Sequence, residues 1–137
     1  MVDLSEREAP KTIEALWKSL PIRGKLLHAR YSGQEVLIEQ RGDKVIRSPK
    51  ENQVYNVLPG DVGYWYSWFG DDRYLRDVPE FSEIVMIYGR YTALRSVYGP
   101  AAMNLIGTVE GNLKDFAEAC GRIHSEGPTT VVLRKLR

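Results

Sequence analysis

Two basic side chains in the first half of the chain have the types and spacing to bind a small polar molecule. His28 and Arg30 are two residues apart in a predicted strand, so their side chains are expected on one face of it. His28 can exchange a proton near neutral pH, and Arg30 can hold a carboxylate through two parallel hydrogen bonds. The pair is a candidate site for an anion or a carbonyl group. The alternative is a half-exposed strand face that carries polar residues.

A second group of candidates lies near the ends of another predicted strand. Glu83 is placed to act as a general base or to pair with Arg30 or Arg90. The alternative for Glu83 is a structural salt bridge at a strand end. Gly89 precedes Arg90 and allows a ligand or a neighbouring strand to approach the backbone closely, with a β-bulge as the alternative.

Tyrosines between these positions are the remaining candidates. Their hydroxyl groups can orient a ligand, although several aromatic residues of this stretch are equally expected in the core. The loop of residues 68–81 is a candidate lid over a pocket or a contact with a second subunit. The predicted ligand-binding residues are His28, Arg30, Tyr66, Glu83, Tyr88 and Arg90; no residue is assigned a catalytic role.

The elements that must position these side chains centre on residues 54–90. A turn at residues 58–61 contains proline followed by glycine, which suit its second and third positions. Residues 62–69 are rich in aromatic residues and predict a strand. A charged loop follows over residues 73–81. Residues 82–90 form a second, largely apolar run that is typical of a central strand.

Two helices and further strands flank this centre. An apolar stripe with helical spacing begins after Pro10 and stops at Pro21. A second helix is predicted from the N-cap Asn112 to Gly127. The predicted strands are residues 25–31, 34–40, 104–110 and 129–136, with a short fragment at 45–46 and a structured loop at 91–103. Because antiparallel hairpins dominate, the pattern predicts one domain over residues 1–137, mainly β: a closed antiparallel β-barrel with two capping α-helices.

Composition limits the classes of function. The 137 residues carry a net charge of +1, so no general attraction to nucleic acid or to an anionic membrane is expected. No apolar run is long enough to span a membrane, and the charged N-terminal segment lacks a signal core, so a cytoplasmic location is expected. With one cysteine and two histidines far apart in the sequence, neither a metal site nor a cofactor is predicted.

Short motifs occur in a characteristic order along the chain. They are Ala9-Pro10-Lys11-Thr12, His28-Ala29-Arg30-Tyr31-Ser32-Gly33, Pro59-Gly60-Asp61, Tyr88-Gly89-Arg90 and Gly111-Asn112-Leu113. In this order and spacing they resemble a bacterial cyclophilin-like family of uncharacterised proteins, the domain of unknown function 3830. The resemblance runs from Ala9 to the C-terminus and implies a cyclophilin-like barrel. That family carries a β-strand before the first motif, for which only a shortened segment, residues 1–8, is present here.

The resemblance gives expectations for function but names no reaction. The arginine motif of peptidyl-prolyl isomerases is not found in the sequence, so that activity is not expected. Related cyclophilin-like domains occur in enzymes that open lactams and cleave urea-derived amides, which is a fold-level analogy. The prediction is a protein that binds or acts on a small carboxylate- or amide-bearing metabolite at the barrel mouth. The alternative is a non-catalytic interaction module, either a homodimer or homo-oligomer or an accessory subunit of an amide-hydrolysing enzyme.

Overall fold

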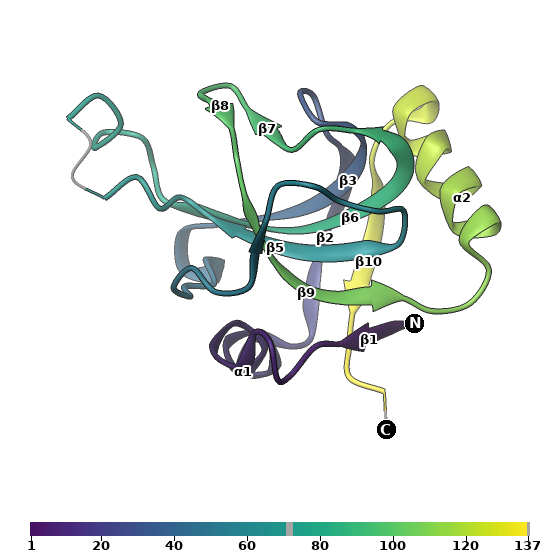
Figure 1. Cartoon of the computed structure of the whole chain (residues 1–137), viewed down its shortest axis with the longest axis horizontal. Helices are drawn as coiled ribbons and strands as arrows, with labels where there is room; N and C mark the ends of the chain where they lie inside the picture. The colour runs from purple at the N-terminus through teal and green to yellow at the C-terminus, as the bar shows by residue number, and fades with distance from the viewer. Residues whose placement is uncertain (71–72, 137) are drawn as a thin grey trace.

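The computed structural model describes residues 1–70 and 73–136, and this part of the chain is mainly β, with two helices (Figure 1). Asp71 and Asp72, within the predicted loop of residues 68–81, lie outside the described residues. The elements are β1 (Val2–Leu4), α1 (Pro10–Ser19), β2 (Ile22–His28), β3 (Gly33–Arg41), a 3-10 turn (Gly42–Lys44), β4 (Gln53–Val54), β5 (Asp61–Tyr66), β6 (Phe81–Thr92), β7 (Arg95–Ser96), β8 (Gly99–Pro100), β9 (Met103–Val109), α2 (Leu113–Glu126) and β10 (Thr129–Leu133).

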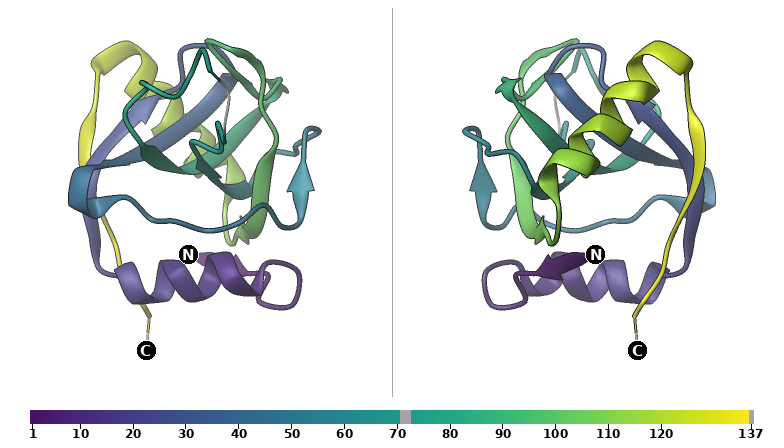
Figure 2. Two further views of the ribbon diagram at one scale, coloured as in Figure 1. Left: turned by 90° about the vertical axis from the view of Figure 1, so that its left-hand side faces the viewer. Right: turned by 90° about the vertical axis from the view of Figure 1, so that its right-hand side faces the viewer.

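One strongly curled antiparallel sheet forms the body of the molecule (Figure 2). Its strand order is β1-β9-β5-β6-β3-β2-β10, with β4 paired to β9. The prediction of a closed barrel is wrong, because β1 and β10 stand at the two ends of this order and each pairs on one side only among the described strands. The sheet is therefore an open half-barrel. With only three residues, β1 offers few backbone groups to a further partner strand.

The segment before the first motif does supply a strand. β1 pairs antiparallel with β9, and its register places Val2 opposite Val109 and Leu4 opposite Gly107. Val2 and Leu4 are partly buried against the core. The segment before the first motif thus provides a three-residue edge strand of the sheet.

Both helices begin where the sequence predicts. α1 starts at Pro10, whose missing N–H costs nothing in the first turn, and buries Ile13 and Leu16. α2 is capped by Asn112, whose side-chain oxygen accepts hydrogen bonds from the backbone N–H groups of Lys114 (3.0 Å) and Asp115 (3.2 Å). α2 packs against β2 and β6, and α1 lies below the curl (Figure 2). No helix in the described part of the chain has the length and apolar character to cross a membrane.

Side chains alternate between two buried faces of the sheet. The main core is enclosed by the curl and contains Val36, Ile38, Ile84 and Met86 together with residues of both helices. The intervening residues of the same strands face the other way. There, a smaller buried cluster forms on the outer face of the sheet and consists of Val85, Ile87, Leu94 and Met103. The residues between β6 and β9 fold over this outer face and complete its cover.

Gly63 on β5 packs so closely against this second cluster that a side chain at this position would collide with it. A Cβ at Gly63 would lie 2.0 Å from the sulfur of Met103, which is 1% exposed. We expect Gly63→Ala to reduce the free energy of unfolding by about 1–3 kcal/mol, because the buried methionine must leave its position. Urea denaturation measures this change. In the double variant Gly63→Ala/Met103→Ala the alanine at 63 should add little to the cost of Met103→Ala; an equal cost in both backgrounds would show that the contact with Met103 is not the cause.

Candidate functional site

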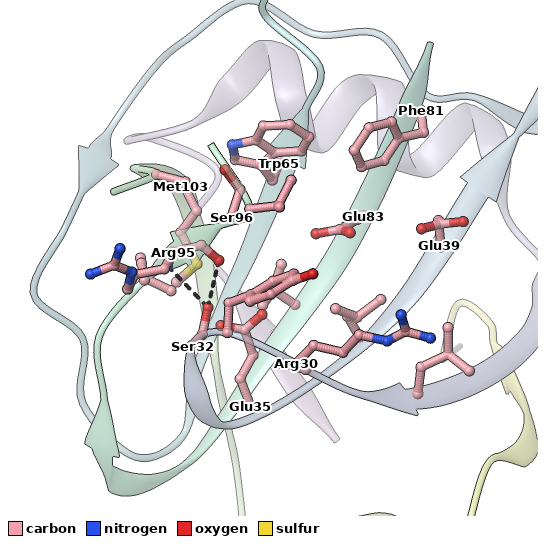
Figure 3. Close-up of a pocket in the computed structure, with 18 of the residues that line it drawn as sticks. Arg30, Ser32, Glu35, Glu39, Trp65, Phe81, Glu83, Arg95, Ser96 and Met103 are labelled. Atoms are coloured by element: carbon pink, nitrogen blue, oxygen red, sulfur yellow. Dashed lines mark hydrogen bonds between the residues drawn. The ribbon is translucent and has the colours of Figure 1, made fainter. Parts of the chain in front are cut away.

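A pocket of about 590 Å³ lies on the face of the curled sheet opposite the main core (Figure 3). Its floor is formed by β3, β5 and β6. Its walls come from residues 29–32, which follow β2, and from residues 94–103, which include the β7–β8 hairpin. Val78 and Pro79 of the loop before β6 also line it, so this loop contributes to the pocket as well.

The alternation of β3 and β6 decides which side chains reach the pocket. On β3, the residues facing outward are Glu35, Leu37, Glu39 and Arg41, and all four line the pocket. The antiparallel register places Leu37 opposite Val85 on β6 and Glu39 opposite Glu83. The floor is thus acidic near each end and apolar between the ends.

Glu35 is the most deeply buried acid of the pocket. It is 4% exposed, and its Oε2 atom has no hydrogen-bond partner among the described residues. The neighbouring Ser32 hydroxyl donates its proton to the carbonyl of Arg95 (3.0 Å) and accepts from the Arg95 backbone N–H (3.1 Å). Because that hydroxyl has a single proton, it cannot fully satisfy Glu35 as well. A buried polar atom without a partner is costly and points to a function for the group.

Burial changes the acidity of this carboxyl group. Removal from water, and then repulsion by the charge of Glu83, raise the pKa of Glu35 to about 7 from 4.5, against an opposing hydrogen bond from Ser32. No nearby cation lowers it. Glu35 therefore gains or loses its proton near neutral pH, which is the property of a group that can both donate and accept a hydrogen bond.

Glu83 provides the second acid, beside a charged pair. Burial and the charge of Glu39 raise the pKa of Glu83 to about 7, and the positive charge of Arg41 opposes them. Arg41 is held by Glu39, with Nε 2.5 Å from Oε1, and its guanidinium carbon lies 4.7 Å from the centre of the Phe81 ring. Arg41 is thus engaged with groups other than Glu83. Trp65 on β5 stands opposite Glu83 and forms an aromatic wall.

The predicted pair His28 and Arg30 is divided by the end of β2. The strand stops at His28, whose Nδ1 donates to the carbonyl of Ala29 (2.8 Å), so its Nε2 accepts from the hydroxyl of Tyr88 (2.7 Å) when the ring is neutral. The ring of His28 also lies 4.7 Å from that of His124 on α2. The His28 ring is therefore engaged with Tyr88 and α2. Arg30 follows in the connecting segment and is exposed at the pocket rim.

The other predicted residues are distributed over the molecule. Glu83 lines the pocket, but Tyr66 donates its hydroxyl to Glu80, which also pairs with Arg47, outside the pocket. Tyr88 is bonded to His28. Arg90 is exposed near the end of β6 and does not line the pocket. Of the six predicted residues, His28, Arg30 and Glu83 contribute to the pocket lining.

Several important pocket residues were missed from the sequence. Glu35 and Glu39 alternate with Val36 and Ile38, and this pattern marks them as the residues on the opposite face from the core. In the sequence alone, such a face cannot be distinguished from a solvated one. Glu35 is buried, and residues 94–103, which are far along the chain, line the same pocket. The described residues contain no group of three or more His, Cys, Asp or Glu arranged to hold a metal ion.

Comparison with known proteins identifies a family but no activity. A family model with the description "Protein of unknown function (DUF3830)" matches residues 1–135, nearly the whole chain. A search of curated proteins found no match.

Proposed function

Because the chain belongs to the family of proteins of unknown function DUF3830, its function has to be inferred from its pocket, and we propose that it binds a small molecule bearing N–H groups, an amide or an amine. Glu35 and Glu83 accept the hydrogen bonds of those groups. Trp65 and the apolar floor contact the rest of the ligand. A pocket of about 590 Å³ is in the range of small-molecule sites, which combine apolar walls with a few polar groups.

The observation that carries this proposal is the unpartnered oxygen of Glu35. A carboxyl group that is 4% exposed pays a penalty for leaving water unless a donor meets it. A ligand N–H provides that donor. Since the pKa of Glu35 is about 7, the same group, when protonated, can also donate a hydrogen bond to a ligand carbonyl such as that of an amide.

The acids also favour one of the two ligand types expected from the sequence, the carboxylate-bearing and the amide-bearing molecule. Three carboxyl groups, those of Glu35, Glu39 and Glu83, line the pocket and would repel a ligand carboxylate. This favours the amide-bearing ligand. A ligand carboxylate, where present, is best placed toward the exposed Arg30 at the rim. We further propose the cyclophilin-like relationship, which is supported by the curled antiparallel sheet and by the motif order.

Exposed side chains at the rim support a second candidate, an interaction module. Tyr31, Val97 and Tyr98 line the pocket opening and are 53%, 63% and 51% exposed. Aromatic residues are enriched in protein interfaces. This candidate predicts a melting temperature that falls on dilution, because a dimer dissociates at low concentration.

A thermal-shift screen tests the proposal. Lactams, hydantoins, pyrimidines, primary amines and dicarboxylates are added at pH 7 to the wild-type protein. We expect amides or amines to raise the melting temperature by several degrees, since a ligand at 100 times its dissociation constant adds about 2.7 kcal/mol to the free energy of unfolding. The shift caused by an amine should be lost in Glu35→Gln, because glutamine cannot pair with an ammonium charge, and the shift caused by an amide should be lost in Glu35→Leu, which removes both oxygens of the carboxyl group.

The matched control is Glu14→Gln on α1, an exposed glutamate whose partner is Lys18. Its ligand shift should equal that of the wild type. Hits confined to dicarboxylates, amine hits that persist in Glu35→Gln, or amide hits that persist in Glu35→Leu would refute the proposal. A melting temperature that depends on dilution without any hit would leave the interaction module as the better account.

A further inference from the structure

The two acids of the pocket stand apart along the sheet. Glu35 is opposite Ile87 and Glu83 is opposite Glu39, so the two positions are separated by four residues of strand, about 13 Å along the chain direction. Leu37 and Val85 form the apolar pair between them. Figure 3 shows Glu35 beside Ser32 and Glu83 further along β6, toward Glu39. Along the strands, the pocket floor is therefore acidic, then apolar, then acidic again, which suits a ligand with two polar ends.

Neither acid has a cation of its own. The charge that acts on Glu35 is the negative charge of Glu83. On Glu83, repulsion by Glu39 exceeds attraction by Arg41, which is bound to Glu39 and packed on Phe81.

Among the described residues, the other basic side chains that line the pocket form no ion pair with Glu35 or Glu83. Arg30 and Arg95 are exposed, and neither forms an ion pair with a described residue. His28 is engaged with Ala29 and Tyr88. Glu35 therefore lacks a neutralising partner among the described residues of the pocket, Glu83 shares Arg41 with Glu39, and the charge of Glu83 disfavours ionisation of Glu35.

From this arrangement, and resting on the proposed function, we infer that the ligand is a short molecule with a protonated amino group at each end, one bound by Glu35 and the other by Glu83. An ammonium group at Glu35 meets the unpartnered Oε2. The apolar middle lies over Leu37 and Val85, and the half-buried Trp65 faces the end at Glu83. Hydrogen bonds between ammonium and carboxylate groups are about twice as strong as neutral ones, and a cation near an indole ring gains further stabilisation.

Such binding must release protons. Near pH 7 the free pocket holds part of its acid protons, because both carboxyl groups have pKa values of about 7. Two ammonium groups favour the ionised carboxylates, and the protons leave to the buffer. A neutral amide keeps the protons in place. Proton release therefore distinguishes the doubly charged ligand from the amide of the broader proposal.

Isothermal titration calorimetry with cadaverine, a linear diamine, tests the inference. Pentylamine is the matched probe, with the same chain and one amino group. At pH 7, in buffers that differ in ionisation enthalpy, we expect cadaverine to bind at least about tenfold more tightly, equivalent to about 1.4 kcal/mol, and to release protons. Glu35→Gln and Glu83→Gln should each reduce cadaverine affinity to the level of pentylamine. Glu14→Gln should leave it unchanged.

The failures of the two proposals are distinguishable. Equal affinity of cadaverine and pentylamine, with both lost in Glu35→Gln, would overturn the inference of two charged ends and retain the amide- or amine-binding pocket. A cadaverine affinity unaffected by Glu83→Gln would also overturn it. If neither amine binds and no amide shifts the melting temperature, both proposals fail.

Discussion

Glu35→Gln is expected to stabilise the protein by about 2–3 kcal/mol at pH 8 and to have little effect at pH 4. The pKa of Glu35 is raised to about 7 in the folded protein from 4.5. The folded protein therefore binds more protons than the unfolded chain between these values. The free energy of unfolding must then fall as pH rises through this window and level off above pH 7. Glutamine carries no charge, so the variant does not bury a charged group at high pH and this fall in the free energy of unfolding disappears.

Urea denaturation at a series of pH values measures the effect. Glu83→Gln should flatten the same part of the curve, because burial also raises the pKa of Glu83 to about 7. The two effects are not additive, since the charge of Glu83 raises the pKa of Glu35. Glu14→Gln is the control, and in this variant the free energy of unfolding should still fall as pH rises above 4.5. A wild-type stability that rises between pH 4.5 and pH 7, unchanged in slope by Glu35→Gln, would contradict the prediction.

Asn104→Ala is expected to reduce the free energy of unfolding by about 3–4 kcal/mol. Asn104 is completely buried on β9. Its Nδ2 donates to the Thr12 hydroxyl and to the Pro49 carbonyl, both at 2.9 Å. Its Oδ1 accepts from the Glu51 backbone N–H (3.1 Å) and from Gln53 Nε2 (2.8 Å). Alanine removes all four hydrogen bonds of this buried side chain, two of them with partly buried backbone groups of residues 49 and 51, and each bond contributes about 0.5–1.5 kcal/mol.

The network ties α1 and residues 45–53 to the sheet, so the loss should affect global stability and be visible in urea denaturation at pH 7. Asn112→Ala is the matched comparison, because it removes an exposed cap with two hydrogen bonds from α2 and should cost about 1 kcal/mol. A cost of Asn104→Ala no larger than that of Asn112→Ala would show that the buried network contributes little.

Local rules predicted the helices well and the limits of the strands less well. Pro10 and Asn112 mark their helix starts by backbone chemistry alone, and both are confirmed. β2 was predicted at residues 25–31 but begins at Ile22, because Ile22 pairs with Leu133 of β10, more than a hundred residues away. Pairing between strands so far apart in the sequence leaves no pattern in the neighbouring residues from which it could be predicted. The same reason explains the open sheet, since closure depends on a contact between the two end strands.

The site was partly predictable for a related reason. Glu83 was predicted near a strand end and Arg30 on one strand face with His28, and both line the pocket. Glu35 and Glu39 carry a signal in their alternation with apolar residues, but this pattern indicates a face and not its burial. Burial of Glu35 comes from Ser32 and from residues 94–103, which were predicted only as a structured loop. His28 was expected to act with Arg30, whereas it contacts Tyr88 on β6 and His124 on α2.

Titration of the side-chain carboxyl carbons by ¹³C NMR tests the central claim most directly, that Glu35 and Glu83 are buried acids of one pocket. Glu35→Gln and Glu83→Gln assign the two signals. We predict midpoints near pH 7 for both, a lower midpoint for Glu35 when Glu83 is replaced, and a shift of both midpoints when an amide or amine is bound. Midpoints near the ordinary value of about 4.3, each unchanged by replacement of the other acid, would contradict the account.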